Sequence, residues 1–408
     1  MSMKRILTTL CLALLLLGCQ KPAPPQALWA GHIHRSDGKA IPFRAYVDLQ
    51  AQPPSGYFLV GDERTPVPEI SRSGDSLTFL FSEYNAAMRG VLHGTTWEGN
   101  YIRYRTSTMS IPFTATAEAH KTAPTTGGAK PAIPLVGKFR AIVGDDKTAD
   151  SSALGTFWMR KDSIFGTLIE PDGDYGLNAG TQSGTVATLS RFTGWQAQLL
   201  ELTQDGSSWK GTIAYRDDKP TTIVLQPRPT HAVTPEGGRK TKIKDTHKPF
   251  WFSGITASGD TLSSTSSRFK GKALIVDVMG TWCHNCMDEA PVLQQVYADF
   301  RDKGLEVVGL SFEINDNAEQ ARKNLTLYGQ RYGITFPLLF CGSTDDKYVA
   351  PQLRSQLMDF YAYPTALFID KAGHVREIHI GFRGPGTGEE FQAEINQVYY
   401  EVRRITGS

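Results

Sequence analysis

The spacing of apolar and polar residues changes along the chain near residue 230. Before it, short runs of β-branched and aromatic residues, such as Leu77–Phe81 and Thr221–Leu225, alternate with Gly, Asp, Asn and Ser. Such runs between turn residues predict a mostly antiparallel β region from residue 28 to about 230. Beyond about residue 248, apolar runs alternate with segments of helical periodicity, which predicts an α/β domain.

The C-terminal pattern is regular enough to place individual elements. Strands are expected at Ala273–Met279, Leu305–Phe312, Phe336–Phe340, Thr365–Asp370 and Val375–Ile380, and helices at Met287–Val296, Asn317–Tyr332 and Glu389–Ile405. This alternation is typical of a sheet covered by helices.

The β-rich region contains an internal echo. Thr95–Tyr101 is similar to Ser207–Ile213, and Ala30–Ile33 is similar to Val136–Phe139. In both pairs the second segment lies roughly 110 residues after the first. The echo predicts two copies of an antiparallel unit of about 100 residues. No catalytic constellation stands out in this region, so a binding or spacer role is expected for it.

Turn-rich and polar segments suggest where the domains begin and end. We expect β-rich units at 28–118 and 134–229, a polar linker at 230–248, and a final domain at 249–408. A chain of 408 residues is long enough for two or three domains with cores of their own.

The N-terminus is typical of an exported protein. Lys4 and Arg5 precede the apolar run Ile6–Leu17, which is short for a membrane span. The run ends in Leu-Leu-Gly-Cys19, which resembles a bacterial lipobox and implies acylation of Cys19. Residues 1–19 are therefore expected to be a lipoprotein signal peptide. An ordinary signal peptide or an uncleaved anchor is the alternative.

This leader predicts a lipid-anchored protein in the cell envelope, facing the oxidising periplasm. A Pro-rich tether at 20–27 would separate the anchor from the folded part. Gln20 follows the acylated cysteine, and by the enterobacterial sorting rule this favours the outer membrane over the inner one. The formal net charge is only +2 at pH 7, without the excess of basic residues typical of nucleic-acid-binding proteins. No nucleic-acid partner is therefore expected.

Two cysteines of the C-terminal domain stand in a context that favours redox chemistry. The run Trp282-Cys283-His284-Asn285-Cys286 follows a predicted strand and opens a predicted helix. A cysteine on the first turn of a helix lies at the positive end of its dipole, which favours the thiolate. Cys286, three residues on, is placed to close a disulfide onto Cys283.

Other readings of the two cysteines fit less well. A structural zinc site needs four ligands, and no second pair stands at zinc spacing. A peroxidatic cysteine would follow a Pro-x-x-x-Thr-x-x-Cys approach, but Val276 and Gly280 occupy the Pro and Thr positions. Thiol-disulfide exchange is therefore favoured, with the Cys283–Cys286 disulfide as the redox group and no metal or organic cofactor. Cys341 is expected to be a buried apolar residue, with a redox role left open.

Residues 250–408 resemble the thioredoxin superfamily, and within it the TlpA/ResA-like thiol-disulfide oxidoreductases of the bacterial envelope. The motifs that carry the resemblance are Phe269–Lys272, the Trp-Cys-His-Asn-Cys run, Glu289 with Pro291, and Tyr363–Thr365. It covers about 40% of the chain and leaves out the β-rich region. It implies a thioredoxin fold at the C-terminus.

The resemblance also implies roles for individual residues. Cys283 would be the attacking thiolate and Cys286 the resolving cysteine. Pro364 matches the cis-proline of the family, and Trp282, Tyr363 and Pro364 would contact the substrate.

Two carboxyl groups compete for the role of proton acceptor for Cys286. Asp277 stands six residues before Cys283, where thioredoxins place a buried aspartate, and Glu289 matches the glutamate of the ResA branch. A desolvated carboxyl has a raised pKa and can accept a thiol proton near neutral pH. We expect Asp277 to act, slightly in preference to Glu289, with the two groups coupled.

The residues between the cysteines leave the direction of the reaction open. Asn285 stands where many family members have Pro, and a charged His284 imidazole would stabilise the thiolate. The expected function is reduction of protein disulfides, with a membrane-borne electron donor restoring the dithiol. The alternatives are a disulfide oxidase or isomerase, and a ligand- or partner-binding lipoprotein whose β region carries the main function.

Overall fold

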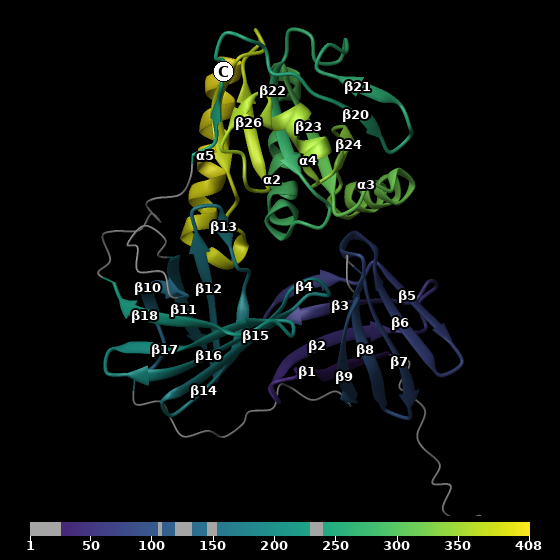
Figure 1. Cartoon of the computed structure of the whole chain (residues 1–408), viewed down its shortest axis with the longest axis vertical. Helices are drawn as coiled ribbons and strands as arrows, with labels where there is room; N and C mark the ends of the chain where they lie inside the picture. The colour runs from purple at the N-terminus through teal and green to yellow at the C-terminus, as the bar shows by residue number, and fades with distance from the viewer. Residues whose placement is uncertain (1–25, 105–107, 119–132, 145–152, 229–239) are drawn as a thin grey trace, which may run out of the picture.

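The computed structural model describes residues 26–104, 108–118, 133–144, 153–228 and 240–408 (Figure 1). The predicted signal peptide, Cys19 and most of the tether lie outside these residues. Within the described ranges, no helix combines the length and the apolar character that crossing a membrane requires.

The first β unit is a nine-stranded antiparallel sheet. Its strand order is β4-β3-β2-β1-β9-β8-β7-β6-β5, so the first and last strands of the unit, β1 and β9, pair with each other. The strands are β1 (Gln26–His34), β2 (Ala40–Asp48), β3 (Ser55–Val60), β4 (Glu63–Pro66), β5 (Glu69–Ser73), β6 (Ser76–Phe81), β7 (Ala86–His93), β8 (Thr96–Tyr104) and β9 (Thr108–Glu118), with a 3-10 turn, η1 (Ser82–Tyr84), between β6 and β7.

The second β unit is also a nine-stranded antiparallel sheet, and it closes on itself because β11 pairs with both β10 and β12. Its order is β11-β10-β18-β17-β16-β15-β14-β12-β13. The strands are β10 (Gly137–Val143), β11 (Ala153–Arg160), β12 (Ser163–Glu170), β13 (Gly173–Asp174), β14 (Asn178–Ser183), β15 (Val186–Phe192), β16 (Ala197–Asp205), β17 (Ser208–Tyr215) and β18 (Thr221–Pro227).

The two sheets repeat one topology. The run β2-β1-β9-β8-β7-β6-β5 in the first unit corresponds strand for strand to β11-β10-β18-β17-β16-β15-β14 in the second. Trp97 on β8 and Trp209 on β17 occupy corresponding strands, and both are fully buried. The sequence echo therefore reflects a repeat of structure.

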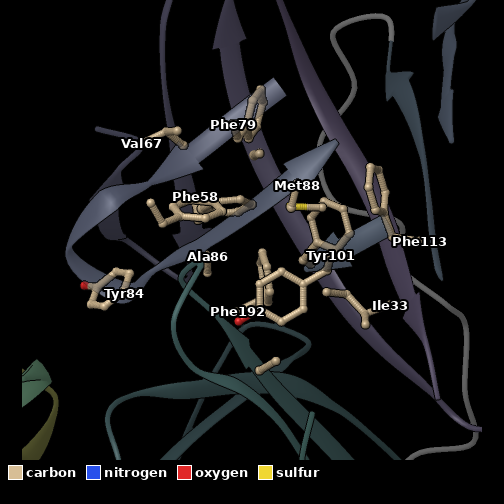
Figure 2. Close-up of a cluster of buried hydrophobic side chains, with 14 of the residues drawn as sticks. Ile33, Phe58, Val67, Phe79, Tyr84, Ala86, Met88, Tyr101, Phe113 and Phe192 are labelled. Atoms are coloured by element: carbon tan, nitrogen blue, oxygen red, sulfur yellow. The ribbon is translucent and has the colours of Figure 1, made fainter. Parts of the chain in front are cut away.

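The two β units share an apolar core (Figure 2). Phe192, at the end of β15, inserts from the second unit among the aromatic rings of the first. Its ring centroid lies 4.8 Å from that of Phe58 and 5.3 Å from that of Tyr101. The units are therefore packed against each other through interlocking side chains.

The C-terminal domain has a seven-stranded sheet of order β21-β20-β24-β23-β22-β26-β27, in which β22, β23 and β24 run parallel. Its strands are β20 (Ser253–Thr256), β21 (Thr261–Ser263), β22 (Ala273–Met279), β23 (Leu305–Glu313), β24 (Leu338–Ser343), β26 (Thr365–Ile369) and β27 (Val375–Ile380). The helices are α2 (His284–Phe300), α3 (Ala318–Tyr332), α4 (Asp346–Val349) and α5 (Glu389–Thr406), with short turns η3 (Arg301–Lys303), η4 (Ala350–Arg354) and η5 (Pro385–Thr387).

Helices cover both faces of this sheet. Leu293 of α2 and Val402 of α5 share one apolar core with Ile275, whereas Val349 of α4 packs with Val276 in the core of the other face. This arrangement confirms the expected thioredoxin fold behind an antiparallel β region. The domain stands over the two β units, which lie side by side (Figure 1).

Two of the differences from the expected elements concern β24 and the linker. β24 begins at Leu338 and not at Phe336, because Pro337 has no N–H to donate to the ladder. The Pro337 carbonyl accepts the N–H of Gly309 in β23. Part of the expected linker is also ordered: β19 (Lys242–Ile243) pairs with β25 (Leu357–Met358) of the C-terminal domain.

Candidate functional site

Cys283 and Cys286 form a disulfide at the start of α2. Their Cα atoms are 5.2 Å apart, within the usual range for such a bond. Cys283 is the N-cap of the helix, and its Sγ accepts a hydrogen bond from the Cys286 N–H at 3.2 Å. The sulfur of Cys283 therefore lies where the helix N-terminus stabilises negative charge.

Both cysteines are buried, with 5% and 0% of their surface exposed. Side chains of the β units cover this end of α2. The Tyr84 hydroxyl donates to the Met287 Sδ at 3.1 Å, and the Trp195 ring lies 6.2 Å from that of Trp282. The β-rich region thus forms part of the redox site, which the sequence did not indicate.

Charged residues from four elements lie around His284. Arg191 of β15 forms two hydrogen bonds with Glu63 of β4, at 2.7 and 2.8 Å, and its Nη2 lies 3.5 Å from the His284 Nδ1. On the other side of the ring, Nε2 lies 3.3 Å from Asp288 and 3.9 Å from Asp174. The imidazole therefore stands between a guanidinium and two carboxyl groups.

The balance of these contacts shifts the pKa values. Burial lowers the pKa of His284, but Asp288 and Asp174 outweigh burial and the nearby Arg191, so the pKa is raised overall. Burial raises the pKa of Asp174, yet its contacts with His284 and two backbone N–H groups outweigh burial and lower it. These shifts favour a charged His284 imidazole paired with an ionised Asp174.

Asp174, His284 and Asp288 also place ligand atoms within 4.8 Å of one another, the spacing of a metal site. Their surroundings fit hydrogen bonding better than a cation. Both oxygens of Asp174 accept backbone N–H groups, from Gly176 and Gly384, each at 2.6 Å. The Arg191 guanidinium beside the same imidazole adds positive charge that would repel a cation.

Asp277 and Glu289 are buried on the α2 side of the sheet. Side chains alternate along β22, so Asp277 faces the same way as Ile275, which packs in the α2 core. The two carboxyl groups are 4% and 2% exposed, and Asp277 Oδ1 and Glu289 Oε2 have no hydrogen-bond partner among the described residues. Burial raises the pKa of Asp277 to about 7. Burial, and then the charge of Asp277, raise that of Glu289 well above its usual value.

The expected substrate-contact residues lie together beside the disulfide. The Tyr363–Pro364 peptide bond is cis, as the family resemblance implies. The Tyr363 ring lies 5.5 Å from that of Trp282, whose indole N–H donates to the Phe312 carbonyl at 2.9 Å. Trp282 and Tyr363 line one wall of the entry to the site.

A cavity of about 310 Å³ opens between this wall and the second β unit. Trp282, Asn285 and Tyr361–Tyr363 line one side, and Glu170 and residues 172–175 line the other. The loop around β13 therefore forms the opposite wall of the entry.

Cys341 is buried on β24 and is a free thiol. Its S–H lies 3.5 Å from the Ser253 carbonyl, and burial raises its pKa strongly. A thiol of this kind is a poor nucleophile because little thiolate forms.

Reasoning from sequence missed the residues that the β units bring to the site, above all Asp174, Arg191 and Tyr84. Asp174 lies in a turn-rich segment, Pro-Asp-Gly-Asp-Tyr-Gly, whose composition indicates a turn and no chemistry. Arg191 is one arginine in an otherwise ordinary strand, and only the structure shows that it is buried.

Comparisons with known proteins concern the C-terminal part. Residues 247–378 match the AhpC/TSA family. The chain is 30% identical over 130 residues to the thioredoxin-like protein YneN of Bacillus subtilis, a match that spans 32% of this chain and 68% of that protein. It is 26% identical over 137 residues to the thiol-disulfide oxidoreductase ResA of Geobacillus thermodenitrificans, over 31% of this chain and 69% of that one.

A solved structure of a thiol:disulfide interchange protein of the thioredoxin family, from Chlorobium tepidum, superposes with a TM-score of 0.27 and 27% identity. This match spans 36% of the present chain and 97% of the other.

Proposed function

Because the chain belongs to the TlpA/ResA-like thiol-disulfide oxidoreductases of the thioredoxin superfamily, we propose that it reduces protein disulfides outside the cytoplasm through Cys283 and Cys286. One observation carries the proposal: Cys283 caps α2, and Glu289 lies one helical turn beyond Cys286, buried together with Asp277. A nucleophile at a helix N-terminus and a proton acceptor behind the second thiol are what the reaction needs.

In the first step the Cys283 thiolate of the reduced enzyme attacks one sulfur of a client disulfide. The client S–S bond breaks as a mixed disulfide with Cys283 forms, and the departing client thiolate takes a proton from solvent. The N-terminus of α2 and the His284 side chain stabilise the attacking thiolate.

In the second step Cys286 resolves the mixed disulfide. Its thiol gives a proton to Asp277 or Glu289, and the resulting thiolate attacks the Cys283 sulfur. The second client sulfur leaves as a thiolate and takes the proton from the carboxyl group, so the client has gained two electrons and the Cys283–Cys286 disulfide remains. A membrane-borne donor of two electrons then restores the dithiol.

Client segments would enter through the cavity between the second β unit and the wall that contains Trp282 and Tyr363. The backbone of Tyr363 would pair with an extended client segment, which places its disulfide at Cys283. Clients that expose a disulfide in a flexible loop suit this narrow entry.

The proposal is tested by capturing clients. A full-length Cys286→Ser variant, expressed in the native envelope, should accumulate mixed disulfides through Cys283, because the resolving thiol is missing. Purified wild type should catalyse insulin reduction by dithiothreitol, Cys283→Ser should not, and Cys341→Ala should match wild type. Wild-type and Cys283→Ser proteins that behave alike in both assays would refute the proposal.

A disulfide oxidase is the second candidate, and the surroundings of His284 favour it. A charged imidazole stabilises the Cys283 thiolate, and stabilising the reduced form makes a dithiol more oxidising. Equilibration with glutathione redox buffers decides between the two directions. A potential near that of thioredoxin supports the reductase, and one near that of DsbA supports the oxidase.

Lipid anchoring at Cys19 belongs to the same proposal and rests on the leader sequence. Metabolic labelling with a palmitate analogue should mark the wild type and leave Cys19→Ala unlabelled. Fractionation of the envelope then distinguishes the outer from the inner membrane. An unlabelled wild type in the soluble fraction would contradict the anchor.

A further inference from the structure

The second β unit reaches the redox site with one buried charge. Asp174, on the two-residue strand β13, is 8% exposed, and its side-chain surface is 1% exposed. Its segment packs closely against the C-terminal domain, because a Cβ added to the neighbouring Gly173 would lie 1.8 Å from the Asn285 side chain. The mechanism above assigns no task to this carboxylate.

Asp174 is held in place by both domains. Its Oδ1 accepts the N–H of Gly176 within its own turn, and its Oδ2 accepts the N–H of Gly384 in the C-terminal domain, each at 2.6 Å. With both oxygens fixed in this way, Oδ1 lies 3.9 Å from the His284 Nε2. The geometry allows Asp174 to act on the imidazole and through it on Cys283, the preceding residue.

Every charged group around the imidazole affects whether it carries a proton. Asp288 of α2 and Asp174 of β13 favour the charged ring, while Arg191 of β15 opposes it. Glu63 of β4 offsets Arg191 through their paired hydrogen bonds. Burial raises the pKa of Asp288 to about 7, so this group is only partly ionised at neutral pH, whereas Asp174 stays ionised.

We propose that Asp174 is a positioning residue of the redox site, which the second β unit supplies to hold the His284 imidazole in its charged form beside the Cys283 thiolate. The β region then sets the thiolate population and the redox poise of a cysteine pair located in another domain. The inference rests on the proposed function in that Cys283 is taken as the attacking thiol.

The test uses the full chain with Asp174→Asn, which removes the charge and keeps the size. Labelled-histidine NMR should give a lower pKa for His284. Alkylation of reduced Cys283 at pH 6 should slow by about three- to tenfold, since one pKa unit is a tenfold change in thiolate. The equilibrium with glutathione should move toward the enzyme disulfide by a similar factor, and a tenfold change is about 30 mV.

Three further variants separate this role from a structural one. Asp162→Asn removes an exposed carboxylate from the β11–β12 turn of the same unit and should change none of the three readouts. Asp174→Glu keeps the charge, so its three readouts should lie closer to those of the wild type than the readouts of Asp174→Asn do. In a His284→Gln background, Asp174→Asn should add no further change in Cys283 alkylation, because the residue through which it acts is gone.

An Asp174→Asn protein with an unchanged His284 pKa, or with faster Cys283 alkylation, would overturn the inference. If Asp174→Asn does not fold, His284→Gln becomes the test, and it must slow the alkylation of reduced Cys283. A His284→Gln protein that is alkylated at the wild-type rate would overturn the inference equally. A wild type whose cysteines do not equilibrate with glutathione would refute the proposed function, while the His284 titration would still decide on Asp174.

Discussion

The hydroxyl of Tyr84 donates a hydrogen bond to the Sδ of Met287 at 3.1 Å and so joins the first β unit to the helix that carries the cysteines. The Tyr84 ring also stacks on Trp195, with ring centroids 5.4 Å apart. Beside them, Glu83 pairs with Arg331 of α3 at 2.9 Å. The β units therefore cover the disulfide through specific polar contacts as well as apolar packing.

Weakening this cover should change how large clients reach Cys283. Tyr84→Ala removes a buried ring, at a cost on the order of 3 kcal/mol in packing. We expect insulin reduction to become about three- to tenfold faster, because the cover parts more readily, while a small disulfide such as hydroxyethyl disulfide reacts at nearly the wild-type rate. Steady-state assays with both substrates measure the difference.

Tyr46→Ala is the matched control, because Tyr46 is a half-buried ring of the same unit that stacks on Tyr57. It should leave both rates unchanged. A Tyr84→Ala enzyme that is slower with insulin would mean that the covering residues assist the reaction.

The resolving step should depend on a carboxylate. If Asp277 accepts the Cys286 proton, decay of the mixed disulfide should quicken as the pH rises through about 7, because only the ionised group can accept. Asp277→Asn should remove this rise and slow the decay by about 100-fold or more. Rapid-quench trapping of the mixed disulfide between pH 5 and 9 measures the rate.

Glu289→Gln gives the comparison between the two acids. If Glu289 is the acceptor, the mixed disulfide should decay slowly in Glu289→Gln and at nearly the wild-type rate in Asp277→Asn. Wild-type decay that is independent of pH over this range would exclude both carboxyl groups.

Asp277 should also lower stability at high pH. The pKa of Asp277 is about 7 in the folded protein and about 3.8 in the unfolded chain. The stability that Asp277 contributes is therefore fully present below about pH 3.8 and is lost as the pH rises to about 7. The loss is on the order of 4 kcal/mol at 1.36 kcal/mol per pKa unit. Asp277→Asn should therefore gain stability over the wild type, and more at pH 8 than at pH 5.

Urea unfolding of the oxidised proteins, followed by tryptophan fluorescence, measures this difference. Asp299→Asn, a change on the exposed side of α2, should show the same difference from the wild type at both pH values. An Asp277→Asn gain that does not grow between pH 5 and pH 8 would contradict the prediction.

The packing between the two β units should depend strongly on the Phe192 ring. Phe192 is 2% exposed and packs among rings of the first unit (Figure 2). Phe192→Ala should lower the free energy of unfolding of the β region by about 3–5 kcal/mol. Val186→Ala, on the same strand with 47% exposure, should change it little, and hydrogen exchange in β15 and β3 compares the two variants.

Local patterns determined much of this protein from sequence alone. The turn residues and alternating runs predicted the two β units, because strand and turn preferences act over a few residues. The strand before the cysteines and the helix after them predicted a redox pair for the same reason. The family resemblance added the cis bond before Pro364 and pointed to Asp277 and Glu289, and the structure buries both acids.

Only the tertiary structure decided what surrounds the cysteines. Asp174 and Arg191 lie roughly 100 residues before His284, in strands whose composition indicates nothing but a β unit. Packing of one domain on another brings their charges within 4 Å of the imidazole. Contacts of this kind follow from the shape of whole domains and leave no periodic trace in the sequence. The sequence therefore predicted a redox pair at Cys283 and Cys286, and the fold decided which charges surround it.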